Sequence, residues 1–250
     1  MPCRRLWGGG GQGGVCQCLT LPRRPPAPGA RVRGQGRAAA RVAPATPRVR
    51  VDPLADVEGP AAAARGRQIL CLAGAGPGRG DLADNWRLAA AALRAASPGQ
   101  RVVLCSSAAV YGAQSGALRE TTQLRPVSAY GRAKSEMEQR AAALAAELGV
   151  RLCVLRIGNI AGLDACLGGW APGFQLDQFD DGRTPARSYI GVATLARVLA
   201  DLLALDLLPG VLNLAQPGLV EMGALLSAAG LDWAARPAPD TDLATVLLHT

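Results

Sequence analysis

The pattern of apolar and polar positions predicts a regular alternation of strands and helices in the middle of the chain. Apolar runs at residues 68–72, 101–106 and 151–156 have the length of strands, and their continuous hydrophobicity is typical of strands covered on both faces. The segments between them, residues 82–96 and 128–148, are alanine-rich and typical of helices. This order predicts an α/β fold built on a doubly wound, Rossmann-like parallel sheet.

The first fifth of the chain has a different composition. Residues 1–48 are rich in arginine, glycine and proline and contain no serine. Three interpretations stay open for this segment: a poorly ordered basic tail, an arginine-rich targeting segment, or a wrongly assigned start or shifted reading frame. We expect a Rossmann-like core over residues 49–162 and a small C-terminal lobe, interleaved with that core, over residues 163–250.

The charge distribution separates the same two parts. The whole chain carries +8, whereas residues 1–51 hold ten arginines and no acidic residue, so the rest of the chain sums to −2. A nearly neutral globular part argues against a nucleic-acid-binding surface on it, although a basic N-terminal arm that contacts nucleic acid stays open as an alternative. No apolar run approaches about 18 residues, so no membrane-spanning helix is expected.

The scarcity of certain residue types narrows the chemistry. The seven cysteines form no CxxC pair, which favours reduced thiols in a cytoplasmic protein. His249 is the only histidine and lies next to the last residue of the sequence, which argues against a Ser-His-Asp triad and against a metal site built from histidines. No metal is expected.

Three residues in the middle of the chain form a candidate catalytic group. Lys134 is the only lysine among 27 basic residues, and Tyr130 precedes it by one helical turn, so both side chains lie on one helix face. An ammonium near a phenol favours the phenolate, which predicts a tyrosine pKa below the usual value of about 10. Ser107 follows an apolar strand. The alternatives are that Tyr130 and Lys134 are ordinary residues of a helix surface, and that Ser107 only forms a turn or caps a helix.

Two groups of small residues could approach a phosphate or a ligand. Ala73 and Gly74 follow the strand at residues 68–72, where a backbone can approach a ligand closely. Gly8, Gly10 and Gly13 have the spacing GxGxxG. Only seven residues precede Gly8, and a proline-rich stretch follows instead of a helix, so the structural context of a dinucleotide fingerprint is missing.

Residues 68–230 resemble the extended short-chain dehydrogenases/reductases, the NAD-dependent epimerase/dehydratase group. The motifs are ILCLAG, the helical segment around Asn85, SSAAVYG with RPVSAYGRAKSEME, LRIGNIAG and RSYIGVATLARVL. The resemblance implies that the C-terminal lobe lies on the substrate side and that NAD or NADP is the cofactor. It also implies roles for these residues: catalysis by Ser107, Tyr130 and Lys134; cofactor contacts from Ala73, Gly74, Tyr130, Lys134 and Asn159; and substrate contacts from Ser107, Asn159 and Arg187.

The expected activity is that of an epimerase/dehydratase or reductase-type oxidoreductase on a hydroxyl or carbonyl substrate, with a nucleotide sugar suggested by analogy. Arg23 and Arg24 would suit the 2′-phosphate of NADP. The expected partners are a small-molecule substrate and a second copy of the chain. Because the family's opening strand, glycine turn and helix have no convincing counterpart, a non-catalytic dinucleotide-fold protein stays open as the alternative.

Overall fold

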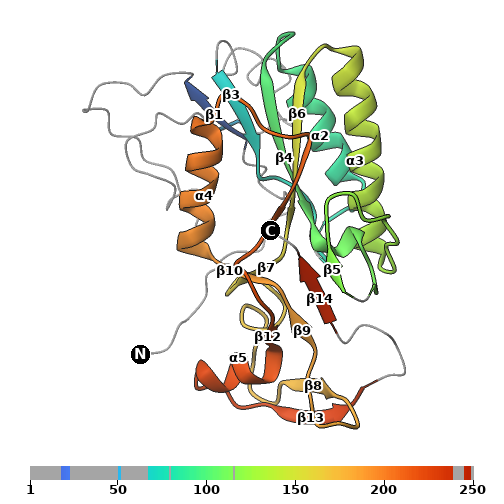
Figure 1. Cartoon of the computed structure of the whole chain (residues 1–250), viewed down its shortest axis with the longest axis vertical. Helices are drawn as coiled ribbons and strands as arrows, with labels where there is room; N and C mark the ends of the chain where they lie inside the picture. Colours follow the sequence, from blue (N-terminus) through green and yellow to red (C-terminus); the bar gives the residue numbers. More distant parts are fainter. Residues whose placement is uncertain are drawn as a thin grey trace, which may run out of the picture.

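The core of the protein is a mixed six-stranded sheet in the strand order β11-β6-β4-β3-β1-β2. Figure 1 labels β6, β4, β3 and β1 of this sheet. The structure is a computed structural model and describes residues 18–22, 50–51, 67–78, 80–114, 116–238 and 245–248. Four neighbouring strands run parallel: β3 (Arg67–Cys71), β4 (Arg101–Ser107), β6 (Arg151–Ile157) and β11 (Val211–Leu214). The α/β fold and its parallel sheet are confirmed.

Helices cover both faces of this sheet, as the continuous apolar runs predict. On one face, α2 (Asp84–Arg94) and α3 (Ala129–Glu147) lie side by side, and α4 (Val192–Ala204) lies on the other (Figure 1). Successive residues of each strand pack on opposite faces. In β4, for example, Val102 and Leu104 pack with the α2 and α3 cluster, whereas Val103 packs with the α4 cluster.

The helix that carries Tyr130 and Lys134 has well-defined ends. Ser128 has an extended backbone, and its Oγ accepts a hydrogen bond of 3.0 Å from the Gly131 amide, which satisfies one of the free amides of the first turn. Gly149 follows the helix with a φ of 65°, a conformation that glycine adopts without strain. The predicted helix over residues 128–148 is therefore confirmed to within one residue at each end.

One strand differs from the expected parallel order. β1 (Cys18–Pro22) pairs antiparallel with β3, and β2 (Arg50–Val51) pairs antiparallel with β1. The register aligns Cys18 with Cys71, so β1 begins, rather than ends, at the edge where β3 ends. A parallel neighbour would require a crossover connection, whereas an antiparallel one does not.

A second region lies beyond the carboxyl ends of the parallel strands. Its short strands and helix are β7 (Asn159–Ala161), β8 (Gln175–Gln178), β9 (Ala186–Arg187), β10 (Tyr189–Gly191), β12 (Val220–Glu221), α5 (Met222–Ala228), β13 (Ala234–Pro237) and β14 (Thr245–Leu248). Its small core centres on Cys166, Leu176 and Leu226. β14 runs between β9 and β5 (Ala117–Leu118), so a segment from the first half of the chain takes part in the second region (Figure 1).

Within the residues that the structure describes, every helix is too short or too polar to cross a membrane.

Candidate active site

The candidate site forms where β3 and β4 end and α3 begins. Ser107 is the last residue of β4 and also caps the short 3-10 helix η2 (Ala108–Val110), because its Oγ accepts a hydrogen bond of 3.2 Å from the Ala109 amide. The serine therefore has a fixed position at the carboxyl edge of the sheet, the edge where open α/β sheets bind ligands. The interpretation of Ser107 as a cap is correct, and it does not prevent the hydroxyl from contacting Tyr130.

Tyr130 lies in the first turn of α3, is half-buried and has the Ser107 side chain as a polar neighbour. Its burial raises its pKa above the usual value, because the charged phenolate loses hydration, and the Ser107 side chain offsets only part of this rise. The prediction of a lowered pKa is therefore wrong for this structure. The phenolic form of Tyr130 is favoured at neutral pH.

Lys134 lies one turn further along α3 and is 5% exposed. Its Nζ donates a hydrogen bond of 2.8 Å to the Cys105 carbonyl oxygen and lies 6.0 Å from the centroid of the Tyr130 ring. Burial lowers the pKa of Lys134, while the nearby Glu138 carboxylate raises it in part. The prediction that tyrosine and lysine share one helix face is confirmed.

A small polar cradle surrounds the Lys134 ammonium. The Asn85 amide nitrogen donates to the carbonyl oxygens of Ala75 and Leu82 at 3.2 and 3.1 Å. Asn85 Oδ1 is buried and has no hydrogen-bond partner among the residues that the structure describes. A Cβ on Gly74 would lie 2.5 Å from this oxygen and 2.9 Å from Lys134 Nζ, so only glycine allows the three groups to come this close.

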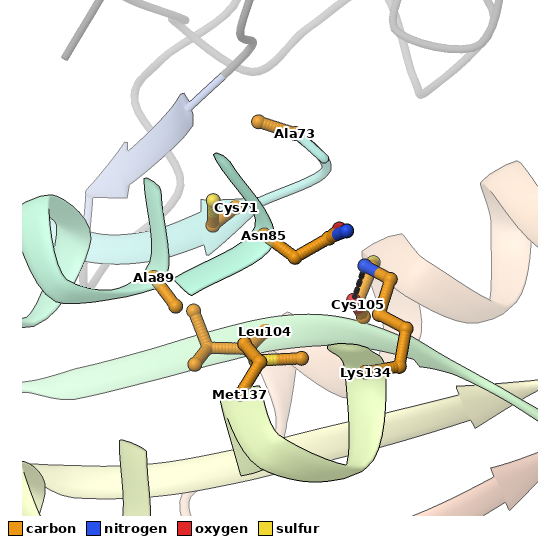
Figure 2. Close-up of a pocket in the computed structure, with 8 residues that line it drawn as sticks. All are labelled: Cys71, Ala73, Asn85, Ala89, Leu104, Cys105, Lys134 and Met137. Atoms are coloured by element: carbon orange, nitrogen blue, oxygen red, sulfur yellow. Dashed lines mark hydrogen bonds between the residues drawn. The ribbon is translucent and has the colours of Figure 1, made fainter. Parts of the chain in front are cut away.

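Figure 2 shows a small pocket at these groups, with the Asn85 and Lys134 side chains converging from α2 and α3. The residues that line it are Cys71, Ala73, Asn85, Ala89, Leu104, Cys105, Lys134 and Met137. A buried unpartnered acceptor beside an ammonium fits a ligand that carries hydroxyl groups, because the acceptor requires a donor and the ammonium can bond an oxygen. The ribose of a nicotinamide dinucleotide has such groups, so these residues fit that cofactor.

The remaining candidate residues have different positions. Asn159 lies two residues beyond Ile157, which is the register partner of Ser107 between β4 and β6. The backbone N–H of Asn159 donates a hydrogen bond of 2.9 Å to the Ser188 carbonyl oxygen. Arg187 lies on β9 in the second region, where burial lowers its pKa. Their predicted substrate roles stay predictions. Gly8, Gly10, Gly13, Arg23 and Arg24 lie outside the described residues.

A buried ion pair near the site was not predicted from the sequence. Arg156 Nη2 lies 2.8 Å from Glu138 Oε2, and both side chains are 7% exposed. Two signals could have indicated it: Glu138 follows Lys134 by one helical turn, and Arg156 lies within the otherwise apolar run LCVLRI.

The fold and the site define a class: a Rossmann-like α/β protein with Ser, Tyr and Lys at the carboxyl edge of its sheet. Residues 79–166 match the model of the NAD dependent epimerase/dehydratase family, which confirms the resemblance over the block that contains Ser107, Tyr130 and Lys134. A comparison with curated proteins finds no match.

Solved structures extend the comparison. MoeE5 in complex with UDP-glucuronic acid and NAD is 26% identical, with a TM-score of 0.51, and the match covers 66% of this chain and 60% of MoeE5. UDP-glucose 4-epimerase from Brucella ovis in complex with NAD is 21% identical over 80% of this chain and 75% of its own, with a TM-score of 0.66. The UDP-glucose 4-epimerase of Thermus thermophilus in complex with NAD is 22% identical over 78% of this chain and 74% of its own, with a TM-score of 0.59. The last two show a shared fold. The chain spans about 60% of the length of MoeE5.

Proposed function

We propose that this protein binds NAD or NADP and acts as an epimerase/dehydratase or reductase-type oxidoreductase on a hydroxyl or carbonyl substrate. The observation that carries the proposal is the joint position of Ser107 at the end of β4 and of Tyr130 and the buried Lys134 ammonium in the first turns of α3, at the carboxyl edge of a parallel sheet. The match of residues 79–166 to the epimerase/dehydratase family model supports it. MoeE5 and the two epimerases were solved with NAD, which supports the choice of cofactor.

The chemistry of the residues follows from their environments. In its phenolate form, Tyr130 accepts the proton of a substrate hydroxyl as the carbon that bears this hydroxyl is oxidised, and as a phenol it returns the proton when the carbonyl is reduced. Ser107 donates a hydrogen bond to the same substrate oxygen and stabilises the charge that develops there. The Lys134 ammonium favours the phenolate and would hold the ribose hydroxyls of the dinucleotide. A nicotinamide dinucleotide at this edge supplies the hydride acceptor and donor.

Substitution of Tyr130 by phenylalanine tests the assignment. Tyr130→Phe removes one oxygen and leaves the ring in place, so the fold and the affinity for NADH are expected to stay close to those of the wild-type protein. General acid–base catalysis contributes about 10²- to 10⁴-fold, so turnover of UDP-glucose or UDP-glucuronic acid is expected to fall by that factor. Ser107→Ala serves as the companion variant and should also reduce turnover. Unchanged turnover in Tyr130→Phe would contradict the catalytic role.

A second candidate is a non-catalytic protein with a dinucleotide fold. The antiparallel direction of β1 favours this alternative, because a parallel strand that leads into a glycine-rich turn is the usual phosphate cradle at this edge. Calorimetric titration of the wild-type protein with NADH and NADPH separates the two candidates. Saturable binding at micromolar concentration would exclude a non-catalytic protein that has lost its cofactor site. The absence of binding heat with both nucleotides would exclude the proposed enzyme.

A further inference from the structure

A buried polar network lies directly behind the candidate site, and none of its members takes part in the proposed chemistry. At its centre, Arg156 donates to Glu138 through Nη2 at 2.8 Å and through Nε at 3.1 Å. The Ser106 hydroxyl donates to the other carboxylate oxygen of Glu138. Both oxygens of the carboxylate are therefore hydrogen-bonded, which is the condition for a charged pair to be tolerated in a core.

The network continues away from the site on the far side of Arg156. Arg156 Nη1 donates to the Tyr111 hydroxyl and to the Glu120 carbonyl oxygen, both at 3.0 Å. The Tyr111 hydroxyl in turn donates to Asn213 Oδ1 on β11 at 2.6 Å. One guanidinium thus joins α3, β6, the loop after η2 and, through Tyr111, β11.

The members of the network are adjacent in sequence to the residues of the site. Ser106 precedes Ser107 on β4 and is the register partner of Arg156 on β6. Glu138 follows Lys134 by one turn on α3, and α3 is a single helix of 19 residues that also carries Tyr130. The bond between Ser106 and Glu138 therefore fixes the two elements that carry the site relative to each other, close to where Ser107 and Tyr130 meet.

The hydrogen bonds of the network can fix the position of α3 in a way that its apolar contacts cannot. The apolar contacts of α3 with the sheet, such as those of Met137 and Ala141, are non-directional and tolerate small shifts of the helix. Charge-assisted hydrogen bonds have a defined geometry and do not tolerate such shifts. A buried ion pair is weak evidence for stability, because apolar residues of similar volume often replace such a pair without loss.

We infer that Glu138 and Arg156 are positioning residues that hold α3 against β4 so that Tyr130 stays beside Ser107. The inference rests on the proposed function for its kinetic consequence, because a misplacement of about 1 Å costs on the order of 100-fold in rate. Neither side chain touches the substrate in this role.

The test replaces both partners at once. Glu138→Met combined with Arg156→Met removes one negative and one positive charge and keeps similar volume, so the net charge of the core is unchanged. The matched control is Glu136→Met with Arg140→Met, a surface pair on the same helix with a separation of 2.9 Å and side chains that are 63% and 48% exposed. Turnover, KM, NADH affinity and the thermal midpoint are measured for both double variants and the wild type.

We expect kcat of the buried double variant to fall by about 10- to 100-fold, while KM and NADH affinity change less than about threefold. The surface control should keep kcat close to that of the wild type. A folded buried variant with wild-type kcat overturns the inference. Should that variant not fold, Glu138→Gln alone decides the question in the same assay: a reduced kcat supports the positioning role, and a wild-type kcat overturns it.

A second readout does not depend on turnover. The chain has three tyrosines, so tyrosine labelled with ¹³C at Cζ gives few signals, and the Tyr130→Phe variant assigns that of Tyr130. The proximity of the Ser107 side chain lowers the pKa of Tyr130, so a shift of α3 away from β4 in the buried double variant should raise that pKa, and the surface control should not. If the wild type shows no turnover, the proposed function fails while this titration still decides the positioning role. An unchanged pKa overturns it.

Discussion

Substitution of Gly74 by alanine tests the geometry of the cradle most directly. The new Cβ would lie 2.5 Å from Asn85 Oδ1 and 2.9 Å from Lys134 Nζ, closer than real Cβ atoms approach such neighbours. Neither side chain can retreat freely, because Asn85 is bonded to two backbone carbonyls and Lys134 Nζ to the Cys105 carbonyl. The alanine methyl group therefore displaces at least one of them.

The magnitude follows from the bond that is lost. A hydrogen bond to a charged group contributes about 1.5–3 kcal/mol, and a strained insertion of one methyl group into a packed site costs about 1–3 kcal/mol. Replacing glycine by alanine also reduces the entropy of the unfolded chain, which returns about 0.4–1 kcal/mol. We expect a net loss of about 1.5–5.5 kcal/mol, equivalent to a decrease of roughly 3–22 °C in the thermal midpoint for a chain of this size.

Gly76→Ala is the matched control, because a Cβ at Gly76 would meet no atom within 4 Å. It should be neutral or slightly stabilising. Circular dichroism gives the two thermal midpoints, and NADH titration should show weaker binding for Gly74→Ala alone. Equal midpoints and equal NADH affinities in the two variants would refute the close approach of Gly74 to Asn85 and Lys134.

Two further predictions concern α3. Lys134 is the only lysine, so protein labelled with ¹³Cε-lysine gives one signal, which should titrate below the usual pKa of about 10.4 because burial disfavours the ammonium. The unfolded chain then binds more protons between the folded pKa and about 10.4, so this group's contribution to stability rises with pH across that window; titration at or above about 10.4 would contradict the burial. Ser128→Ala removes the cap on the Gly131 amide and should lower the free energy of unfolding by about 1 kcal/mol in a denaturant titration, and a loss below about 0.3 kcal/mol would show that the cap contributes little.

The sequence predicts the parallel core well for a physical reason. In β4, residues on both faces are apolar, and the flanking helices bury both faces, so the continuous apolar run identifies the strand. The same reasoning locates Ser107, because a serine that ends such a run must lie at the carboxyl edge. The direction of β1 could not be predicted, since hydrophobicity along a strand indicates which faces are buried and not which way the strand runs.

The sequence does not predict the ion pair or the direction of the Tyr130 pKa shift, because both depend on how deeply the side chains are buried. Glu138 and Arg156 are charged, and charged residues are rarely buried unless paired, so the sequence alone places them at the surface. Their pairing depends on the contact between α3 and β6, which no local pattern describes. The spacing of Tyr130 and Lys134 correctly indicates a shared face, but it does not indicate how strongly that face is desolvated.

Burial acts in opposite directions on the two titratable groups of the site. It raises the pKa of Tyr130 and lowers that of Lys134, so both shifts favour the uncharged forms. The proposed reaction requires a phenolate, at least transiently, and the ammonium that favours it lies 6.0 Å from the ring centroid. The Ser107 side chain lowers the pKa of Tyr130 and therefore contributes to the stabilisation of the phenolate oxygen. This is why a change at Arg156, which touches neither Tyr130 nor Ser107, is expected to act on kcat.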